Sequence, residues 1–217
     1  MMKRKTLFAG ALALLVVLAA FTAQSQTAIE TLAIGAAAPK ADVKMQSTKG
    51  AELSLNDARQ QNGLLVVFSC NTCPFVVGDA EGTTGWEGRY MELNRMAAGK
   101  NMGMVLVNSN EAKREKGDNL EDMRMRATEH GFSQMNYVLD KNSDLANAFG
   151  ARTTPHVFLF DKDMKLVYRG AIDDNVDNPN AVKATYLKDA MGNLASGKPV
   201  NPNDTKPVGC SIKRVVQ

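Results

Sequence analysis

Histidine, tryptophan and cysteine are scarce in this sequence of 217 residues, which holds two, one and three of them. There is no second Cys-x-x-Cys and no pair of histidines at helical spacing. A structural zinc site would therefore have to recruit distant residues such as Cys210, His130 or His156. The odd number of cysteines leaves one thiol unpaired within the chain. This count argues against a framework of purely structural disulfides.

An excess of one charge is also missing once the N-terminus is set aside. The chain has 26 Lys and Arg against 23 Asp and Glu. Three of the basic residues, and none of the acidic ones, lie within residues 1–25, so 23 basic residues face 23 acidic ones in the remainder. A nucleic-acid partner has no electrostatic support in such a chain, and we predict none.

Residues 1–25 are typical of a secretory signal peptide. A basic start at Lys3, Arg4 and Lys5 precedes an apolar run over 7–21, and Ala23-Gln24-Ser25 places small residues at the usual cleavage spacing. The apolar run is short for a membrane span, although an uncleaved anchor remains the alternative. We predict cleavage after Ser25, a periplasmic or secreted protein, and no stable membrane insertion afterwards. Disulfides persist in such compartments.

The rest of the chain alternates strand and helix patterns. Continuous apolar runs, typical of strands buried on both faces, occur at 63–69 and 103–110, with a shorter strand at 135–140. Helical spacing is found over 86–100, 119–132, 142–151 and 180–198. Hairpins are predicted around Lys49-Gly50 and over 156–172. We therefore predict an α/β three-layer sandwich, with a mixed central sheet, helices on both faces and an added N-terminal hairpin.

Two cysteines stand in the segment SCNTCPF, directly after the apolar run 63–69. We predict that a helix begins at Cys70, where unpaired amide groups and the helix dipole would stabilise its thiolate. Cys70 would attack a partner disulfide, and Cys73, one turn on, would resolve the mixed disulfide. Cys70 is accordingly expected to be the more exposed thiol. A passive disulfide is the alternative, but so tight a loop constrains little of the unfolded chain.

Thr154-Pro155 directly precedes the strand predicted at 156–161. Proline cannot donate a hydrogen bond to a sheet, so a turn of the backbone is expected at this point. A cis peptide bond between Thr154 and Pro155 would provide that turn.

These two features together resemble the thioredoxin fold. The redoxin (AhpC/TSA-like) branch of this fold is resembled by three features, namely GAAAP, GAELSL and the central insertion. A subgroup with CNxCP(Y/F)V and C-terminal GCSIK motifs is resembled by four segments: CNTCPFV, RTTPHVFLFD, KLVYRGAIDDN and KPVGCSIK. The resemblance implies a thioredoxin-like domain over 33–197, a tail over 198–217, and no cofactor. It implies thiol–disulfide oxidoreductase activity on a protein or small thiol that carries a disulfide or dithiol.

The resemblance also assigns residue roles. It makes Cys70 the nucleophile, Cys73 the resolving thiol and Pro155 the cis-proline facing them, while Thr154 offers its backbone to an extended partner peptide. Three departures stand out. Ser69 replaces the usual Trp, Thr72 replaces a frequent His, and a Gly-rich insertion over 77–88 should break the active-site helix. A PxxxTxxC motif is absent, which speaks against the alternative of a thiol peroxidase-like antioxidant protein.

A second alternative is a copper-binding assembly factor of the same fold, with Cys70, Cys73 and His156 as ligands. The scattered methionines and Trp86 are expected to pack in the core instead. His130 is expected to end a helix, and Asp173-Asp174 to be solvated turn residues.

The odd cysteine, Cys210, lies in the tail segment KPVGCSIK. It could serve as a second resolving thiol, link two chains or simply be buried as a free thiol. Gly209 permits an unusual backbone angle, and Ile212 provides an apolar anchor. We predict a docked tail with Cys210 as an unpaired thiol.

Overall fold

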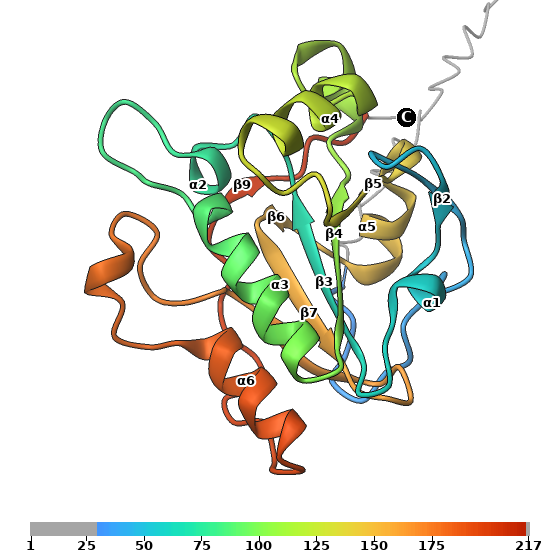
Figure 1. Ribbon diagram of the computed structural model, residues 1–217, viewed down its shortest axis with the longest axis vertical. Coiled ribbons are helices and arrows are strands. Elements are labelled where there is room, and N and C mark those ends of the chain that lie inside the picture. Colours follow the sequence, from blue (N-terminus) through green and yellow to red (C-terminus); the bar gives the residue numbers. More distant parts are fainter. Residues whose placement is uncertain (1–29, 216–217) are drawn as a thin grey trace, which may run out of the picture.

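A computed structural model describes residues 30–215 (Figure 1). The predicted signal peptide lies outside the described residues, so its cleavage stays a prediction. Within the described part of the chain, no helix is both long and apolar enough to cross a membrane.

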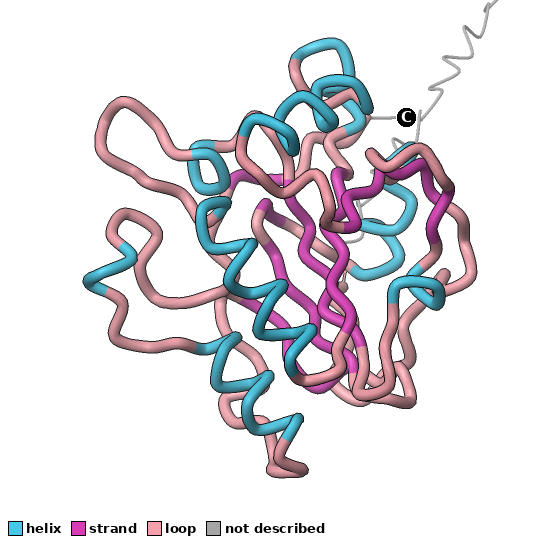
Figure 2. The backbone as a smooth tube through the Cα atoms, in the orientation of Figure 1, coloured by secondary structure: helices cyan, strands magenta, loops and turns pink. Residues whose placement is uncertain are grey.

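A seven-stranded mixed sheet forms the centre of the fold (Figure 2). In spatial order its strands are β2 (Glu52–Leu53), β1 (Met45–Ser47), β5 (Asn136–Leu139), β4 (Gly103–Asn108), β3 (Leu64–Ser69), β7 (His156–Phe160) and β8 (Leu166–Gly170). The pairs β3–β4 and β4–β5 are parallel, and the other pairs are antiparallel. The predicted mixed sheet is confirmed, as are both predicted hairpins.

Helices cover both faces of this sheet, which confirms the predicted three-layer α/β architecture. They are α1 (Leu55–Ala58), α2 (Pro74–Val77), α3 (Tyr90–Gly99), α4 (Leu120–Glu129), α5 (Asp144–Phe149) and α6 (Tyr186–Ala195). Short 3-10 turns occur at Glu87–Arg89, Glu111–Lys116, Lys141–Ser143 and Pro179–Ala181.

Strand β3 shows why a continuous apolar run is needed at the centre of the fold. Because successive side chains point to opposite faces, Leu65 and Val67 pack against α3, α4 and α6, in what we term the α3-side core. Leu64, Val66 and Phe68 pack against α1 and α5, in the α5-side core. All six residues of β3 are buried, as the sequence pattern predicted.

A second, two-stranded sheet lies at the end of β3 and carries the tail. It pairs β6 (Thr153–Thr154) with β9 (Cys210–Ser211) in antiparallel fashion. Figure 1 shows β9, near the C-terminus, beside β6 and below α2. The tail therefore returns to the segment directly before Pro155.

Candidate active site

The CxxC forms the turn between β3 and α2. The helix begins at Pro74 with Cys73 as its N-cap, so the predicted start at Cys70 is wrong. Proline is favoured at the first helical position because its missing N–H needs no partner there, and Cys70 is left in the preceding turn. The helix ends after one turn at Gly78, which has φ of 80°. The Gly-rich segment thus breaks the helix, as predicted.

Both thiols contact Thr154. The Cys70 Sγ lies 3.2 Å from the Thr154 hydroxyl oxygen, and the Cys73 thiol donates to the Thr154 carbonyl oxygen at 3.2 Å. The peptide bond between Thr154 and Pro155 is cis, as predicted. The fold therefore brings together two segments that are some 80 residues apart in the sequence.

The expected difference in exposure between the two thiols is absent. Cys70 is 1% exposed and Cys73 is 2% exposed, and both belong to the α3-side core. The prediction that Cys70 is the more accessible thiol is therefore wrong for this reduced state. Cys70 is buried by its contact with Thr154 and its packing in the α3-side core, and the tail lies beside Cys73.

Electrostatics distinguishes the two thiols although burial does not. The hydrogen bond with Cys73, burial and the nearby Asp118 carboxylate raise the pKa of Cys70 well above its usual value. The hydrogen bond from Cys70, with further ones from the Cys210 thiol and N–H, lowers the pKa of Cys73 to about 5 despite burial. When the pair loses its first proton, the negative charge is therefore favoured on Cys73, and the hydrogen bond that the Cys73 thiol donates to Thr154 is then lost.

Asp118 is a buried residue that the sequence did not single out. Its carboxylate accepts hydrogen bonds from the Asn71 N–H at 2.7 Å and the Thr72 hydroxyl at 2.7 Å, both within the CxxC. It also accepts from the side-chain amides of Asn108 at 2.8 Å and Asn110 at 3.0 Å. Asp118 thus fixes the backbone of the turn, and the Thr72 hydroxyl is directed to Asp118. Its only signal in the sequence is its position near Asn108 and Asn110, after the strand parallel to β3.

Cys210 lies directly beside this pair. It is the strand partner of Thr154, and its backbone N–H donates to the Cys73 Sγ at 3.4 Å. Ile212 is 5% exposed, so the predicted docked tail is confirmed. All three cysteines are free thiols in this reduced state, so the prediction that Cys210 stays unpaired when the others oxidise remains a prediction. The role expected for Gly209 is wrong, because its backbone angle is ordinary. A Cβ on Gly209 would lie 2.2 Å from the Thr154 carbonyl oxygen, so Gly209 permits close approach instead.

Comparison with protein families identifies the family to which this chain belongs. The family model described as Redoxin matches residues 33–185, which is most of the chain. The chain belongs to the redoxin family. No curated protein matches this redoxin.

Solved structures agree with the fold. An uncharacterized conserved protein from Geobacillus kaustophilus is 29% identical, with a TM-score of 0.75 over 85% of this chain and 94% of that one. A hypothetical protein from Sinorhizobium meliloti 1021 is 28% identical, with a TM-score of 0.75 over 87% and 98%. The oxidised form of a thioredoxin-like protein is 14% identical, with a TM-score of 0.52 over 75% and 97%. This last likeness shows the thioredoxin-like fold alone.

The alternative copper site is not formed in this redoxin. His156 pairs with Phe68 across β7 and β3 and contacts the Phe158 ring at 4.5 Å, on the α5-side of the sheet. Cys70 and Cys73 belong to the opposite core. Burial lowers the pKa of His156 to about 3, helped by Arg152 and Arg169. Among residues 30–215, no group of three His, Cys, Asp or Glu is placed to hold a metal ion. The ligand set of Cys70, Cys73 and His156 is therefore wrong.

Trp86 packs in the α3-side core, as predicted, and its indole N–H donates to Asp173 at 2.8 Å. Asp173 also forms a buried ion pair with Arg89. The prediction that Asp173-Asp174 is a solvated pair holds for Asp174, which is exposed, and is wrong for Asp173. Asp173 is buried because it follows β8 and its carboxylate contacts Trp86 and Arg89, in and directly after the insertion over 77–88. His130 is the C-cap of α4, as predicted.

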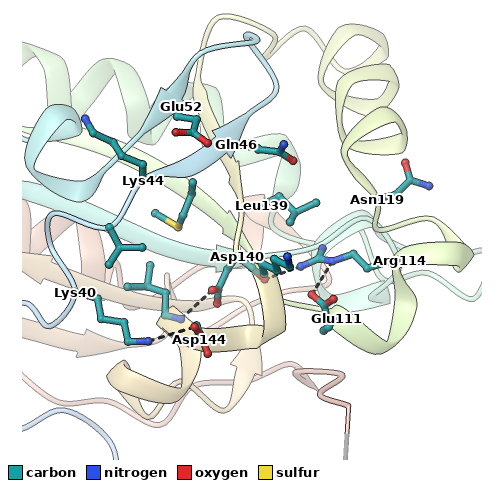
Figure 3. Close-up of a pocket in the computed structure, with 14 residues that line it drawn as sticks. Lys40, Lys44, Gln46, Glu52, Glu111, Arg114, Asn119, Leu139, Asp140 and Asp144 are labelled. Atoms are coloured by element: carbon teal, nitrogen blue, oxygen red, sulfur yellow. Dashed lines mark hydrogen bonds and ion pairs between the residues drawn. The ribbon is translucent and has the colours of Figure 1, made fainter.

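A cavity of about 610 Å³ lies on another part of the surface, between β1 and α5 (Figure 3). None of the three cysteines lines it. Lys40 pairs with Asp144 at 3.4 Å, and Arg114 pairs with Glu111 at 3.2 Å. Arg114 also donates to the Asp118 carbonyl oxygen at 2.7 Å. The cavity therefore adjoins the network beneath the CxxC and contributes no group to the thiols.

Proposed function

We propose that this redoxin is an exported thiol–disulfide oxidoreductase whose Cys70 and Cys73 alternate between dithiol and disulfide. One observation carries the proposal. Both thiols contact the residue before a cis-proline, at 3.2 Å each, at the end of the central strand β3. Two cysteines so close together can form a disulfide with little rearrangement.

In the proposed reaction, the Cys70 sulfur attacks a partner disulfide and releases one partner thiol. The Cys73 thiolate lies in a hydrogen bond with Cys70, so it can accept the Cys70 proton as this attack begins. The released partner thiolate takes up this proton from Cys73. The Cys73 thiolate then attacks the Cys70 sulfur of the mixed disulfide, the bond from Cys70 to the partner breaks, and the second partner sulfur leaves as a thiolate that takes up a proton from solvent. Two electrons pass to the partner, and a Cys70–Cys73 disulfide remains.

The partner is a protein or small thiol that carries a disulfide or dithiol. We propose that Thr154 and Pro155 bind it, but strand β9 pairs with Thr153–Thr154 in this state. An extended peptide can therefore pair with Thr154 only after β9 moves, whereas a small disulfide needs less space. The proposal includes a catalytic domain over 33–197, a tail over 198–217, and export to the periplasm or medium after cleavage behind Ser25.

Reduction of insulin by the reduced mature protein, followed as turbidity, tests the activity. We expect Cys70→Ser and Cys73→Ser to reduce the rate to that without protein. Ser196→Ala, at the exposed end of α6, is the matched control and should retain the wild-type rate. A wild-type rate no faster than that of Cys70→Ser would refute the proposal. The mass of the exported chain, with Gln26 as its first residue, tests the cleavage site.

A further inference from the structure

The strand pairing of the tail places a third sulfur at the CxxC. Cys210 is opposite Thr154 in the β6–β9 ladder, and its N–H donates to the Cys73 Sγ at 3.4 Å. The nearby Cys210 also helps to lower the pKa of Cys73. Cys70 contacts the Thr154 hydroxyl instead. Of the two active-site sulfurs, Cys73 is therefore the one within reach of Cys210.

Anchors on both sides hold Cys210 in this position. Before it, the Thr205 hydroxyl oxygen lies 2.7 Å from the Tyr168 hydroxyl and accepts from the Ala171 N–H at 3.0 Å. After it, Ile212 is buried in the α5-side core, and its N–H donates to the Arg152 carbonyl oxygen at 3.0 Å. Fixing both flanks orders the thiol in advance, which raises its effective concentration at Cys73.

The tail is also tied to the CxxC turn itself. The Lys213 N–H donates to the Asn110 side-chain oxygen at 2.9 Å, and the Asn110 amide donates to Asp118 at 3.0 Å. Asp118 in turn accepts from the backbone of Asn71 at 2.7 Å. A chain of three hydrogen bonds therefore connects the tail to the residue after Cys70. The tail and the CxxC turn therefore form one connected site. A tail that only covered the cysteines would not need these hydrogen bonds to the turn.

We propose that Cys210 is a third redox-active thiol, which exchanges with the Cys70–Cys73 disulfide through the Cys73 sulfur; this inference rests on the proposed function. The Cys210 thiolate attacks the Cys73 Sγ, a Cys73–Cys210 bond forms, and the Cys70–Cys73 bond breaks. The proton of Cys210 goes to solvent, and Cys70 leaves as a thiolate that takes up a proton. No net oxidation occurs. The disulfide moves to the tail, and Cys70 becomes free again.

The position of the tail explains how this exchange would serve the reaction. The segment lies where an extended partner peptide would pair with Thr154, so it occupies that place as a substrate within the same chain. Gly209 makes this approach possible, because a Cβ there would lie 2.2 Å from the Thr154 carbonyl oxygen. A side chain at position 209 would push Cys210 away from Cys73.

Disulfide mapping in glutathione buffers tests the inference. The mature chain is equilibrated, quenched in acid, alkylated and digested without reduction, and disulfide peptides are measured by mass spectrometry. In wild type we expect a Cys73–Cys210 peptide beside the Cys70–Cys73 peptide. Cys70→Ser should close Cys73–Cys210 within the chain, whereas Cys73→Ser should stop at glutathione adducts of Cys70 and Cys210.

Gly209→Ala in the Cys70→Ser background should raise the oxidised glutathione needed for half closure by about tenfold, since it lowers the effective concentration of Cys210. Gly192→Ala, in α6 with nothing within 4 Å of the added Cβ, is the matched control and should leave closure unchanged. Cys73–glutathione together with fully alkylated Cys210 in Cys70→Ser would overturn the inference. Insulin reduction by wild type separates the two proposals. Activity without Cys73–Cys210 refutes only the tail exchange, and that peptide without activity refutes only the oxidoreductase function.

Discussion

Asp118→Asn should destabilise the protein and at the same time make Cys70 more acidic. The carboxylate of Asp118 is buried and accepts four hydrogen bonds, two on each oxygen. Asparagine offers one oxygen and one NH₂ group in the same space. The NH₂ group should replace the oxygen facing Thr72 and Asn110, because the Thr72 hydroxyl can rotate to accept.

That orientation leaves the Asn110 amide facing another donor. An unsatisfied buried donor costs about 1–3 kcal/mol, and the remaining bonds lose the contribution of the charge, for about 1 kcal/mol more. We therefore expect the free energy of unfolding to fall by about 2–4 kcal/mol. Urea denaturation measures this change. Glu129→Gln, an exposed position at the end of α4, is the matched control and should change it by less than about 0.5 kcal/mol.

The acidity of Cys70 provides an independent measurement. The Asp118 charge is one cause of its raised pKa, so removing that charge lowers the pKa. In a Cys73→Ser, Cys210→Ser background, where Cys70 is the remaining cysteine, the pH profile of iodoacetamide alkylation should shift to lower pH on Asp118→Asn. Local unfolding would also lower the midpoint, because burial contributes to the raised pKa, but it would in addition raise the alkylation rate at pH values well above the midpoint, where the removal of a charge alone leaves the rate unchanged. An unchanged or higher midpoint would refute the electrostatic role of Asp118.

Three further variants test the buried features around the site. His156 has a pKa of about 3, so its contribution to the free energy of unfolding is complete above its unfolded pKa and is lost as the pH falls. Urea titrations of the wild type should therefore show a loss of about 2 kcal/mol between pH 7.5 and pH 5 that His156→Phe removes. The same pH dependence of the free energy of unfolding in both proteins would contradict this. Asp173→Ala breaks the buried ion pair with Arg89 and should cost about 3–5 kcal/mol, against less than about 1 for its exposed neighbour in Asp174→Ala; similar costs would show that the pair contributes little. Ile212→Ala should cost about 2–4 kcal/mol by chemical denaturation and speed alkylation of Cys73, whereas Val215→Ala, at an exposed position, should do neither.

The sequence predicted those parts of the fold that depend on local patterns. The apolar run of β3 satisfies both cores at once, so its burial and central place could be read directly. The segments containing Cys73 and Thr154 were expected to meet because of a resemblance, and their contact at 3.2 Å confirms it. Hairpins and the break at Gly78 followed from glycine and turn residues.

Features that depend on tertiary contacts could not be predicted. Asp118 lies in a stretch of charged residues, KREKGD, which has the composition of a solvated loop. Only the meeting of β3 and β4 buries its carboxylate among amide donors. Similarly, Asp173 and Asp174 are alike in sequence, and the contact with Trp86 and Arg89 alone distinguishes them. The exposure of Cys70 was predicted wrongly because it depends on how closely Thr154 and the α3-side core pack against the turn.

The burial of the cysteine pair in the α3-side core has a thermodynamic consequence. Cys70 and Cys73 are packed as core residues, so folding and reduction of the disulfide are two sides of one closed cycle. If oxidation raises the free energy of unfolding, the reduction potential of the folded protein must be lower than that of the unfolded chain, by about 30 mV for each 1.4 kcal/mol. A substitution in the hydrophobic interior, far from any sulfur, can therefore tune the potential if it affects the two redox states unequally. The midpoint of a denaturation curve, measured in both redox states, would then report on the chemistry of the thiols.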